Sequence, residues 1–224
     1  MFPISDSVRS KKFPFINLGL ILITCYVFYL QMTNPDSFTI AYSLVPKNVN
    51  FGEYITLMNF ITSIFLHGGW LHIISNMWFL WIFGDNVEGA IGHFKYLVLY
   101  LLSGISGGLA QYFFMPGSNI PMLGASGAVA GALGAYFLLF PHHKIKTLVP
   151  IFGFLTFTNI SAFIMLGYWF VLQIFSGAVS IPGVETDSGG VAFWAHVGGF
   201  VTGLVLGKLF VNTKNEVIEG EVIG

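Results

Sequence analysis

The amino-acid sequence predicts an all-α membrane protein, built as a bundle of six transmembrane helices with a long, membrane-associated first loop. Two observations predict this class. Only 8% of the 224 residues are charged, 55% are hydrophobic and the mean hydropathy is +0.78, whereas about a quarter of the residues in a soluble domain are charged. In addition, six apolar stretches approach the roughly 20 residues that one crossing of a bilayer requires.

The six apolar stretches follow one another along the chain and are separated by turn signals. We expect the spans at about 14–32, 70–84, 94–114, 125–140, 160–178 and 190–210. The first span follows Arg9, Lys11 and Lys12, so a signal peptide is an alternative interpretation. No small-residue cleavage site follows it, because Gln31 to Pro35 is a poor one. We therefore interpret the first stretch as a retained helix.

The segments between the spans predict the rest of the architecture. Residues 37–66 are interrupted by proline, glycine and charged residues, so we expect short amphipathic pieces that lie on the membrane. Residues 148–158, which precede the fifth span, are expected to be interfacial. There is no internal repeat, so we expect one membrane domain over residues 1–224, with cytoplasmic tails at about 1–13 and 211–224.

The distribution of lysine and arginine predicts the orientation in the membrane. If the N-terminus is cytoplasmic, eight of the nine basic residues fall on inner loops and tails, and only Lys47 lies outside. This bias places both termini in the cytoplasm. The loops at 33–69, 115–124 and 179–189 then lie outside. We expect an integral, multi-pass protein of a prokaryotic plasma membrane.

Charge and cysteine content exclude several classes of partner. The formal net charge of −1 provides no basic field that would attract nucleic acid. Cys25 is the only cysteine, so disulfides and thiolate metal sites are excluded within one chain. We expect the lipid bilayer as a partner, and no nucleic acid, no metal and no cofactor.

Four polar residues on three of the predicted spans fall in the outer half of the membrane. Ser126 opens the fourth span, His196 lies about two turns into the sixth, and His72 and Asn76 lie in the first turns of the second. Serine and histidine are the minimum parts for nucleophilic acyl transfer. The fourth span, at 15 residues from Ser126 to Phe140, rises about 22 Å against a hydrocarbon core of about 30 Å. We therefore expect Ser126 below the outer surface, at the floor of a water-filled cavity.

The second span predicts an oxyanion site beside the serine. His72 and Asn76 are four residues apart, so their side chains project from one helical face. An imidazole and a carboxamide can donate to a developing oxyanion, together with the backbone N–H of Ser126 at a helix N-terminus. Gly124 permits unusual backbone angles and a close approach to a substrate.

Four segments in this order carry a resemblance to a known family. They are residues 67–76 (HGGWLHIISN), 84–88 (GDNVE), 124–131 (GASGAVAG) and 195–203 (AHVGGFVTG). In order, spacing and depth, over roughly residues 50–210, the chain resembles the rhomboid intramembrane serine proteases. The resemblance implies a rhomboid-like six-helix domain. It also implies a serine endopeptidase that cleaves transmembrane segments of single-pass membrane proteins, with small residues at the cut site.

The resemblance implies roles for individual residues. Ser126 would be the nucleophile and His196 the general base, in a dyad without a carboxylate. Trp169, on the fifth span, would belong to a lateral gate for the substrate. Gly199 and Gly203 would let the sixth span press against the fourth, as small residues do between membrane helices.

Further expectations concern the gate, the cytoplasmic side and two departures from the family pattern. The bulky face of the fifth span suits contact with lipid or with a loosely held neighbour; it comprises Phe163, Trp169, Phe170 and Phe175. Glu88 would belong to a structural hydrogen-bond network. Ala130 replaces an aromatic residue that stacks on the histidine in some members, and Ser75 replaces a gate aromatic. What orients His196 is left open.

Alternative interpretations use the same residues. The small residues after Gly124 could serve helix packing alone, and Glu185 or Asp187 could act as a third triad member. A transporter or channel would require ionisable residues or broken helices at mid-membrane, usually with internal repeats, and the sequence has neither. A catalytically inactive relative would lack Ser126 or His196, and both are present.

Overall fold

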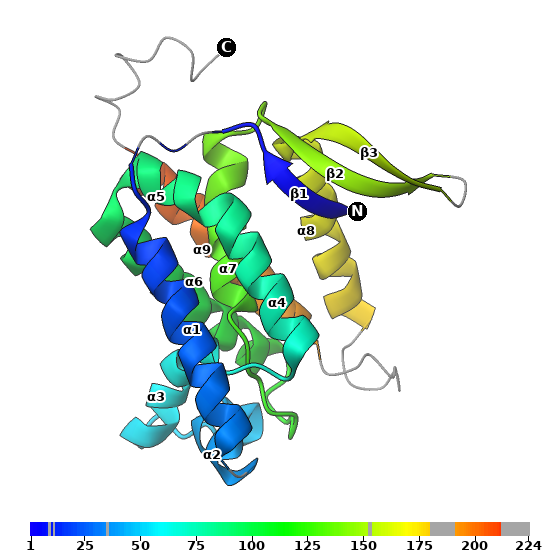
Figure 1. Cartoon of the computed structure of the whole chain (residues 1–224). Helices are drawn as coiled ribbons and strands as arrows, with labels where there is room; N and C mark the ends of the chain where they lie inside the picture. Colours follow the sequence, from blue (N-terminus) through cyan, green and yellow to red (C-terminus); the bar gives the residue numbers. More distant parts are fainter. Residues whose placement is uncertain (9, 11, 35, 152–153, 180–190, 212–224) are drawn as a thin grey trace.

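The computed structural model describes the chain except residues 9, 11, 35, 152–153, 180–190 and 212–224 (Figure 1). The predicted C-terminal tail, most of the loop at 179–189, and with it Glu185 and Asp187, lie outside the described residues. The longer helices are α1 (Phe15–Thr33), α6 (His93–Phe114), α7 (Ser126–Leu139), α8 (Ala162–Val179) and α9 (Phe193–Phe210). Shorter helical pieces join α1 to α6: α2 (Asp36–Tyr42), η1 (Pro46–Asn48), α3 (Tyr54–Thr62), η2 (Ser63–Phe65), α4 (Trp70–Phe79), the π-helical η3 (Leu80–Gly84) and α5 (Asp85–Ile91).

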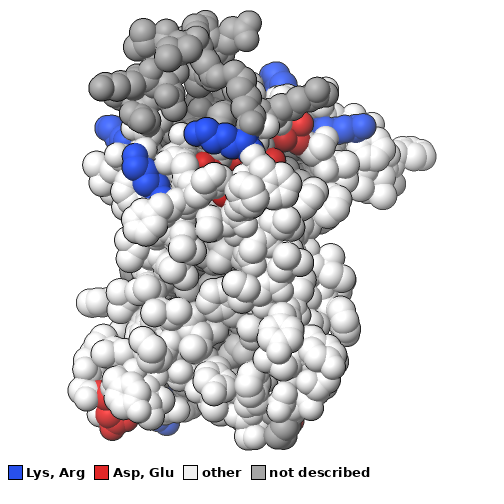
Figure 2. Space-filling model, turned by 60° about the vertical axis from the view of Figure 1, so that its left-hand side comes forward, with Lys and Arg blue, Asp and Glu red and all other residues white. Residues whose placement is uncertain are grey.

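The protein is a mostly helical, multi-pass membrane protein. Within the described residues, α1, α6, α8 and α9 are long and apolar enough to cross a membrane. The pair Tyr54–Phe65 and Trp70–Ile91, bent by 80°, is a further candidate, and α7 is a shorter apolar helix. Figure 2 shows a broad uncharged band, with most lysine and arginine gathered at one end. The predicted spans agree with these long helices to within three residues at each end.

The second predicted span is longer than expected. The helix continues beyond η3 through α5 to Ile91, because its charged residues make hydrogen bonds inside the bundle. The buried carboxylate of Glu88 accepts hydrogen bonds from the backbone N–H groups of Ile16 (3.0 Å) and Asn17 (2.7 Å) in the first turn of α1. It also contacts the ring of His93. These bonds satisfy helix N–H groups that have no intrahelical partner, and they confirm the predicted structural network around Glu88.

The all-α prediction is wrong at the end of the bundle that carries most of the basic residues. There, β1 (Phe2–Asp6), β2 (Lys144–Ile151) and β3 (Phe154–Ser161) form an antiparallel sheet in the order β1-β2-β3 (Figure 1). The segment 148–158 is therefore a β-hairpin, and the predicted N-terminal tail begins with a strand. The physical reason lies in the start of β2, where exposed and buried residues alternate from Lys144 to Thr147, as they do in a half-buried strand.

The N-terminal strand is hydrogen-bonded to three helices at this end of the bundle. The carboxylate of Asp6 accepts hydrogen bonds from the hydroxyl of Tyr136 on α7 (2.7 Å) and from the side-chain amide of Asn86 on α5 (2.8 Å). The indole of Trp78 on α4 donates to the carbonyl of Pro3 (2.8 Å). Burial raises the pKa of the Asp6 carboxyl to about 6. The first strand thus connects α4, α5 and α7 at this end.

Helix α7 lies at the centre of the packing, buried from Gly127 to Tyr136. Its neighbour α9 approaches backbone to backbone. A Cβ added at Gly199 would lie 2.8 Å from the carbonyl carbon of Gly127, and one at Gly203 would lie 2.6 Å from that of Gly131. Only glycine allows this approach, so the predicted contact of the sixth span with the fourth is confirmed. The contact fixes how the serine and histidine helices lie against each other.

Candidate active site

Ser126 begins α7 at the end of a segment that is held in place by its backbone. Gly124 has a φ of 135°, which favours glycine, and its N–H donates to the carbonyl of Ser63 (2.9 Å). The next N–H, of Ala125, donates to Nε2 of His67 (3.4 Å). The backbone N–H of Ser126 lies in the first turn of a helix, where N–H groups have no intrahelical partner. It is therefore available to a ligand.

Gln31 supports this segment from α1, although no pattern in the sequence distinguishes it from other polar residues. Its side-chain oxygen accepts from the N–H of His67 (2.8 Å), and its amide donates to the carbonyl of His67 (3.2 Å). The hydrogen bond between Ala125 and His67 thus links Gln31 to the residue before Ser126. His67 consequently has a structural position between α1 and the start of α7.

A small cavity of about 30 Å³ lies beside Ser126. Its walls come from η2, α6, the segment before α7, and α9, and they comprise Ser63, Ile64, Gly104, Gly108, Met122, Leu123, Gly124, Ser126, Gly127, Ala192 and Ala195. Glycines on two helices keep the space open. Ser126 and Ala195, the residue before His196, line the same cavity. The structure therefore brings the start of α7 and the histidine segment of α9 together.

His72 packs directly against Gly124. A Cβ added at Gly124 would lie 2.6 Å from Cε1 and 2.8 Å from Nε2 of the His72 ring. The N–H of Gly68 donates to Nδ1 of His72 (3.3 Å), so the proton of the neutral ring is assigned to Nε2. That N–H lies beside the backbone that leads into Ser126. The arrangement can donate a hydrogen bond to an anionic oxygen at this point.

Asn76 lies one turn further along α4 and is buried. Its side-chain amide donates to the carbonyl of His72 (3.1 Å), within its own helix. Ser75 likewise donates its hydroxyl to the carbonyl of His72 (2.9 Å). Both predicted donors, His72 and Asn76, therefore belong to one helix. The ring of His72 packs against Gly124, whereas the amide of Asn76 is hydrogen-bonded within the helix.

His196 is held by Gln173, a residue that the sequence reasoning missed. Nδ1 of His196 on α9 lies 2.7 Å from Oε1 of Gln173 on α8. The ring also lies beside Trp169, with ring centroids 5.8 Å apart, and beside Phe193 at 6.4 Å. Ala130 is buried on α7, so no aromatic ring supports the histidine from that position. A signal was present, because Gln173 is an uncharged polar residue inside an apolar span, four positions after Trp169.

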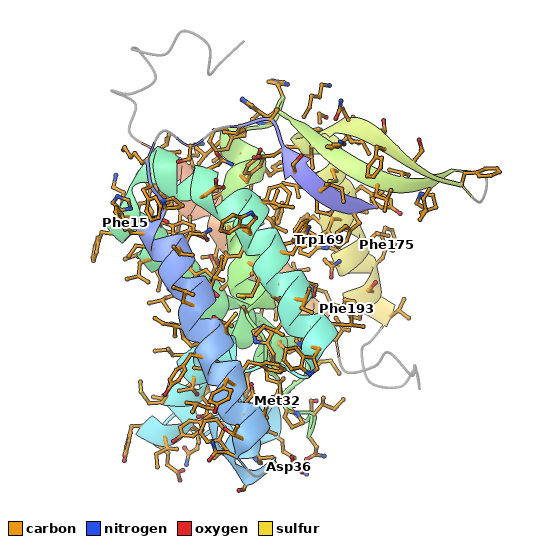
Figure 3. The ribbon with its side chains drawn as sticks, viewed as in Figure 1. Phe15, Met32, Asp36, Trp169, Phe175 and Phe193 are labelled. Carbon is orange, nitrogen blue, oxygen red and sulfur yellow. The ribbon has the colours of Figure 1, made fainter. Side chains whose placement is uncertain are left out.

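Helix α8 carries both packed and exposed aromatic side chains, among them Trp169 and Phe175, which are labelled in Figure 3. Trp169 contacts His196 and Phe200, and Phe170 stacks on Phe200 with centroids 4.4 Å apart. Phe175 is 67% exposed. The expected exposed surface is therefore found at Phe163 (56% exposed) and Phe175, whereas Trp169 and Phe170 pack on the neighbouring helix α9.

Comparisons with known proteins agree with this geometry. Residues 55–213 match the family model described as Rhomboid domain. Rhomboid protein 1, mitochondrial, of Saccharomyces cerevisiae is 32% identical over 161 residues, which are 69% of this chain and 42% of the yeast protein. Rhomboid protease GlpG of Yersinia pseudotuberculosis is 27% identical over 217 residues, which are 96% of this chain and 68% of the relative.

A plant relative gives the same result. Rhomboid-like protein 11, chloroplastic, of Arabidopsis thaliana is 31% identical over 153 residues, which are 66% of this chain and 50% of the plant protein. The chain thus spans half or less of the yeast and plant relatives. The family model covers well over half of the chain, and it includes the segments that hold Ser126 and His196. The chain belongs to the rhomboid family and is homologous to rhomboid proteases.

Proposed function

We propose that this chain is an intramembrane serine endopeptidase that cleaves transmembrane segments of single-pass membrane proteins. The observation that carries the proposal is the cavity shared by Ser126 and Ala195, next to His196. Homology to rhomboid proteases supports the same activity. The working unit is a single rhomboid-like domain over residues 1–224, with six transmembrane helices.

The chemistry follows from a serine and a histidine that have no carboxylate partner among the described residues. The hydroxyl oxygen of Ser126 attacks the scissile carbonyl carbon, and its proton passes to Nε2 of His196. The tetrahedral intermediate then collapses, the C–N bond breaks, and His196 returns the proton to the leaving amine. Water next hydrolyses the acyl-enzyme with His196 again as base. Nδ1 takes no part, because it faces Gln173.

The charge that develops on the carbonyl oxygen is stabilised at the start of α7. The donors are the backbone N–H of Ser126 and the Nε2–H of His72, whose ring packs against Gly124, where a side chain would collide with it. Asn76, on the same helix as His72, supplies a further donor after its amide leaves the carbonyl of His72. Donors fixed in a site that excludes bulk water are the largest single contribution in many acyl-transfer enzymes.

The substrate has small residues at the cut site. The small cavity beside Ser126, with four glycines in its lining, suits a small side chain better than an aromatic one. Substrate reaches the site from lipid past α8, with Trp169 as part of the gate. The chain is oriented with both termini in the cytoplasm, because most lysine and arginine gather at one end of the molecule (Figure 2), and that end carries β1 (Figure 1). Homology to GlpG of Yersinia pseudotuberculosis supports the plasma membrane of a prokaryote. The reaction requires no metal, cofactor or nucleic acid.

A fluorophosphonate probe tests the nucleophile, and digestion of single-pass substrates in liposomes tests the activity. We expect the probe to label the wild type and not Ser126→Ala. Both Ser126→Ala and His196→Ala should abolish cleavage and remain folded, and mass spectrometry of the product should place the cut next to a small residue. Full cleavage by either variant would contradict the dyad. A folded wild type that binds single-pass proteins without cutting them would indicate an inactive relative instead.

A further inference from the structure

Gln173 makes two hydrogen bonds that together fix the direction of its side-chain amide. The oxygen lies 2.7 Å from Nδ1 of His196, and the nitrogen donates to the carbonyl of Trp169 on its own helix (3.4 Å). If the amide were turned by 180°, its oxygen would face the Trp169 carbonyl, and two acceptors would oppose each other. The observed direction therefore follows from the helix itself. It leaves an acceptor, and no donor, in front of His196.

An acceptor at Nδ1 selects one tautomer of the imidazole. Since Gln173 can only accept there, Nδ1 carries the proton and Nε2 keeps the lone pair that a general base needs. We propose that Gln173 is the positioning residue of this site: it holds His196 as the tautomer and in the orientation that accept the proton of Ser126, and it stabilises the imidazolium that forms. The inference rests on the proposed function.

The chemistry of the position explains why a glutamine can serve here. In a serine protease triad a buried carboxylate orients the histidine and stabilises the imidazolium. Inside a membrane an ionised carboxylate is expensive, whereas a neutral amide supplies the same acceptor without a buried charge. Gln173 is itself buried, so water does not compete for the bond. Ala130 offers no aromatic ring on the other side, so the Gln173 amide restricts the His196 ring together with Trp169 and Phe193.

Two variants separate this role from simple packing. Gln173→Met keeps the length of the side chain and removes the acceptor, whereas Gln173→Glu keeps the acceptor and adds a charge. Gln111→Met is a matched control, because Gln111 is also a buried glutamine of a membrane helix, and its amide contacts the sulfur of Met115. The full-length protein is measured in detergent with a soluble peptide, so that passage of substrate between helices does not limit the rate.

We expect Gln173→Met to lower kcat by about ten- to a hundred-fold, the usual effect of losing a hydrogen bond to a charged group, with a KM near that of the wild type. Gln173→Glu should recover much of kcat. It should also move the acidic limb of the pH profile of kcat/KM to higher pH, because a carboxylate stabilises the imidazolium. His72 on α4 is the other titratable group near His196, but it is present in the wild type and in every variant, so the differences between these proteins report on Gln173. Gln111→Met should keep the wild-type profile.

The outcomes distinguish this inference from the proposed function. If Ser126→Ala is inactive while Gln173→Met has wild-type kcat and an unchanged pH profile, the positioning role is wrong and the endopeptidase proposal stands. If Ser126→Ala remains active, the proposed function itself fails. If Gln173→Met does not fold, the pH profile of kcat/KM of Gln173→Glu decides the question. An acidic limb at the same pH as in the wild type would then overturn the inference.

Discussion

Replacing Gly199 by alanine tests whether the contact between α7 and α9 sets the geometry of catalysis. The added Cβ would lie 2.8 Å from the carbonyl carbon of Gly127 and closer still to its oxygen. A carbon atom and a carbonyl oxygen need about 3.2 Å or more, so the two backbones must separate by about 1 Å. Gly127 follows Ser126, and Gly199 lies one turn after His196. Separating the two backbones therefore increases the distance between the nucleophile, Ser126, and the base, His196.

The expected effect is large in rate and moderate in stability. A misplacement of about 1 Å between reacting groups can lower the rate about a hundred-fold. Overpacking of a close contact typically costs about 1–3 kcal/mol. We therefore expect Gly199→Ala to lower kcat by about two orders of magnitude on a soluble peptide. Its unfolding temperature in detergent should fall by several degrees.

A matched control distinguishes the effect of adding a methyl group from the effect of separating two closely packed helices. Gly19 lies in α1, and a Cβ added there would meet nothing within 4 Å. Gly19→Ala should therefore keep the wild-type kcat and unfolding temperature. If Gly199→Ala also behaves as the wild type, the two helices can separate without effect, and the argument from their contact is refuted. A lower unfolding temperature with an unchanged kcat would show that the strain is absorbed away from Ser126.

Three further predictions address the gate, the oxyanion site and the N-terminal strand. Trp169→Ala should raise the ratio of transmembrane to soluble-peptide cleavage, because only the former substrate passes α8; an unchanged ratio would place access elsewhere. Asn76→Ala should lower kcat by about a hundred- to a thousand-fold with a near-normal KM, and an unaltered rate would leave Asn76 a structural role. The pKa of Asp6 is raised from 3.8 to about 6 by burial, with a smaller contribution from the charge of Asp85. The stability that it contributes is therefore complete below about pH 4 and lost as the pH rises through 6. Hydrogen exchange should show the protection of β1 falling over this window, after correction for intrinsic exchange, in the wild type and not in Asp6→Asn.

Hydropathy predicted the helices well and failed where a different periodicity applied. The long helices were recovered because lipid requires an apolar residue at almost every exposed position, and this makes long uniform runs. The hairpin of β2 and β3 was missed because an average over a window cannot detect alternation, such as that of Lys144, Ile145, Lys146 and Thr147. Strand β1 could not be predicted by local means, since its partner lies some 140 residues further along the chain.

The candidate site was predicted in part, for a related reason. Ser126, His196 and His72 stand out because such side chains are rare at membrane depth, and the structure brings the start of α7, the segment before His196, and the ring of His72 to one place. Gln31 and Gln173 were overlooked because an uncharged amide barely changes the hydropathy of a span. Their function lies in their hydrogen-bond partners, which are fixed only when α1 and α8 are packed.

The position of Gln173 has a consequence for how the gate and the chemistry are related. Helix α8 carries Trp169 at the proposed gate and, one turn later, the acceptor for His196. Helix α8 packs on α9 through the stacking of Phe170 on Phe200 and through the close approach of Gly177 to Trp194. A displacement of α8 that admits a substrate also withdraws the amide from Nδ1, so the base is not held while the gate is open. Catalysis then requires that α8 return to α9 after the substrate has entered.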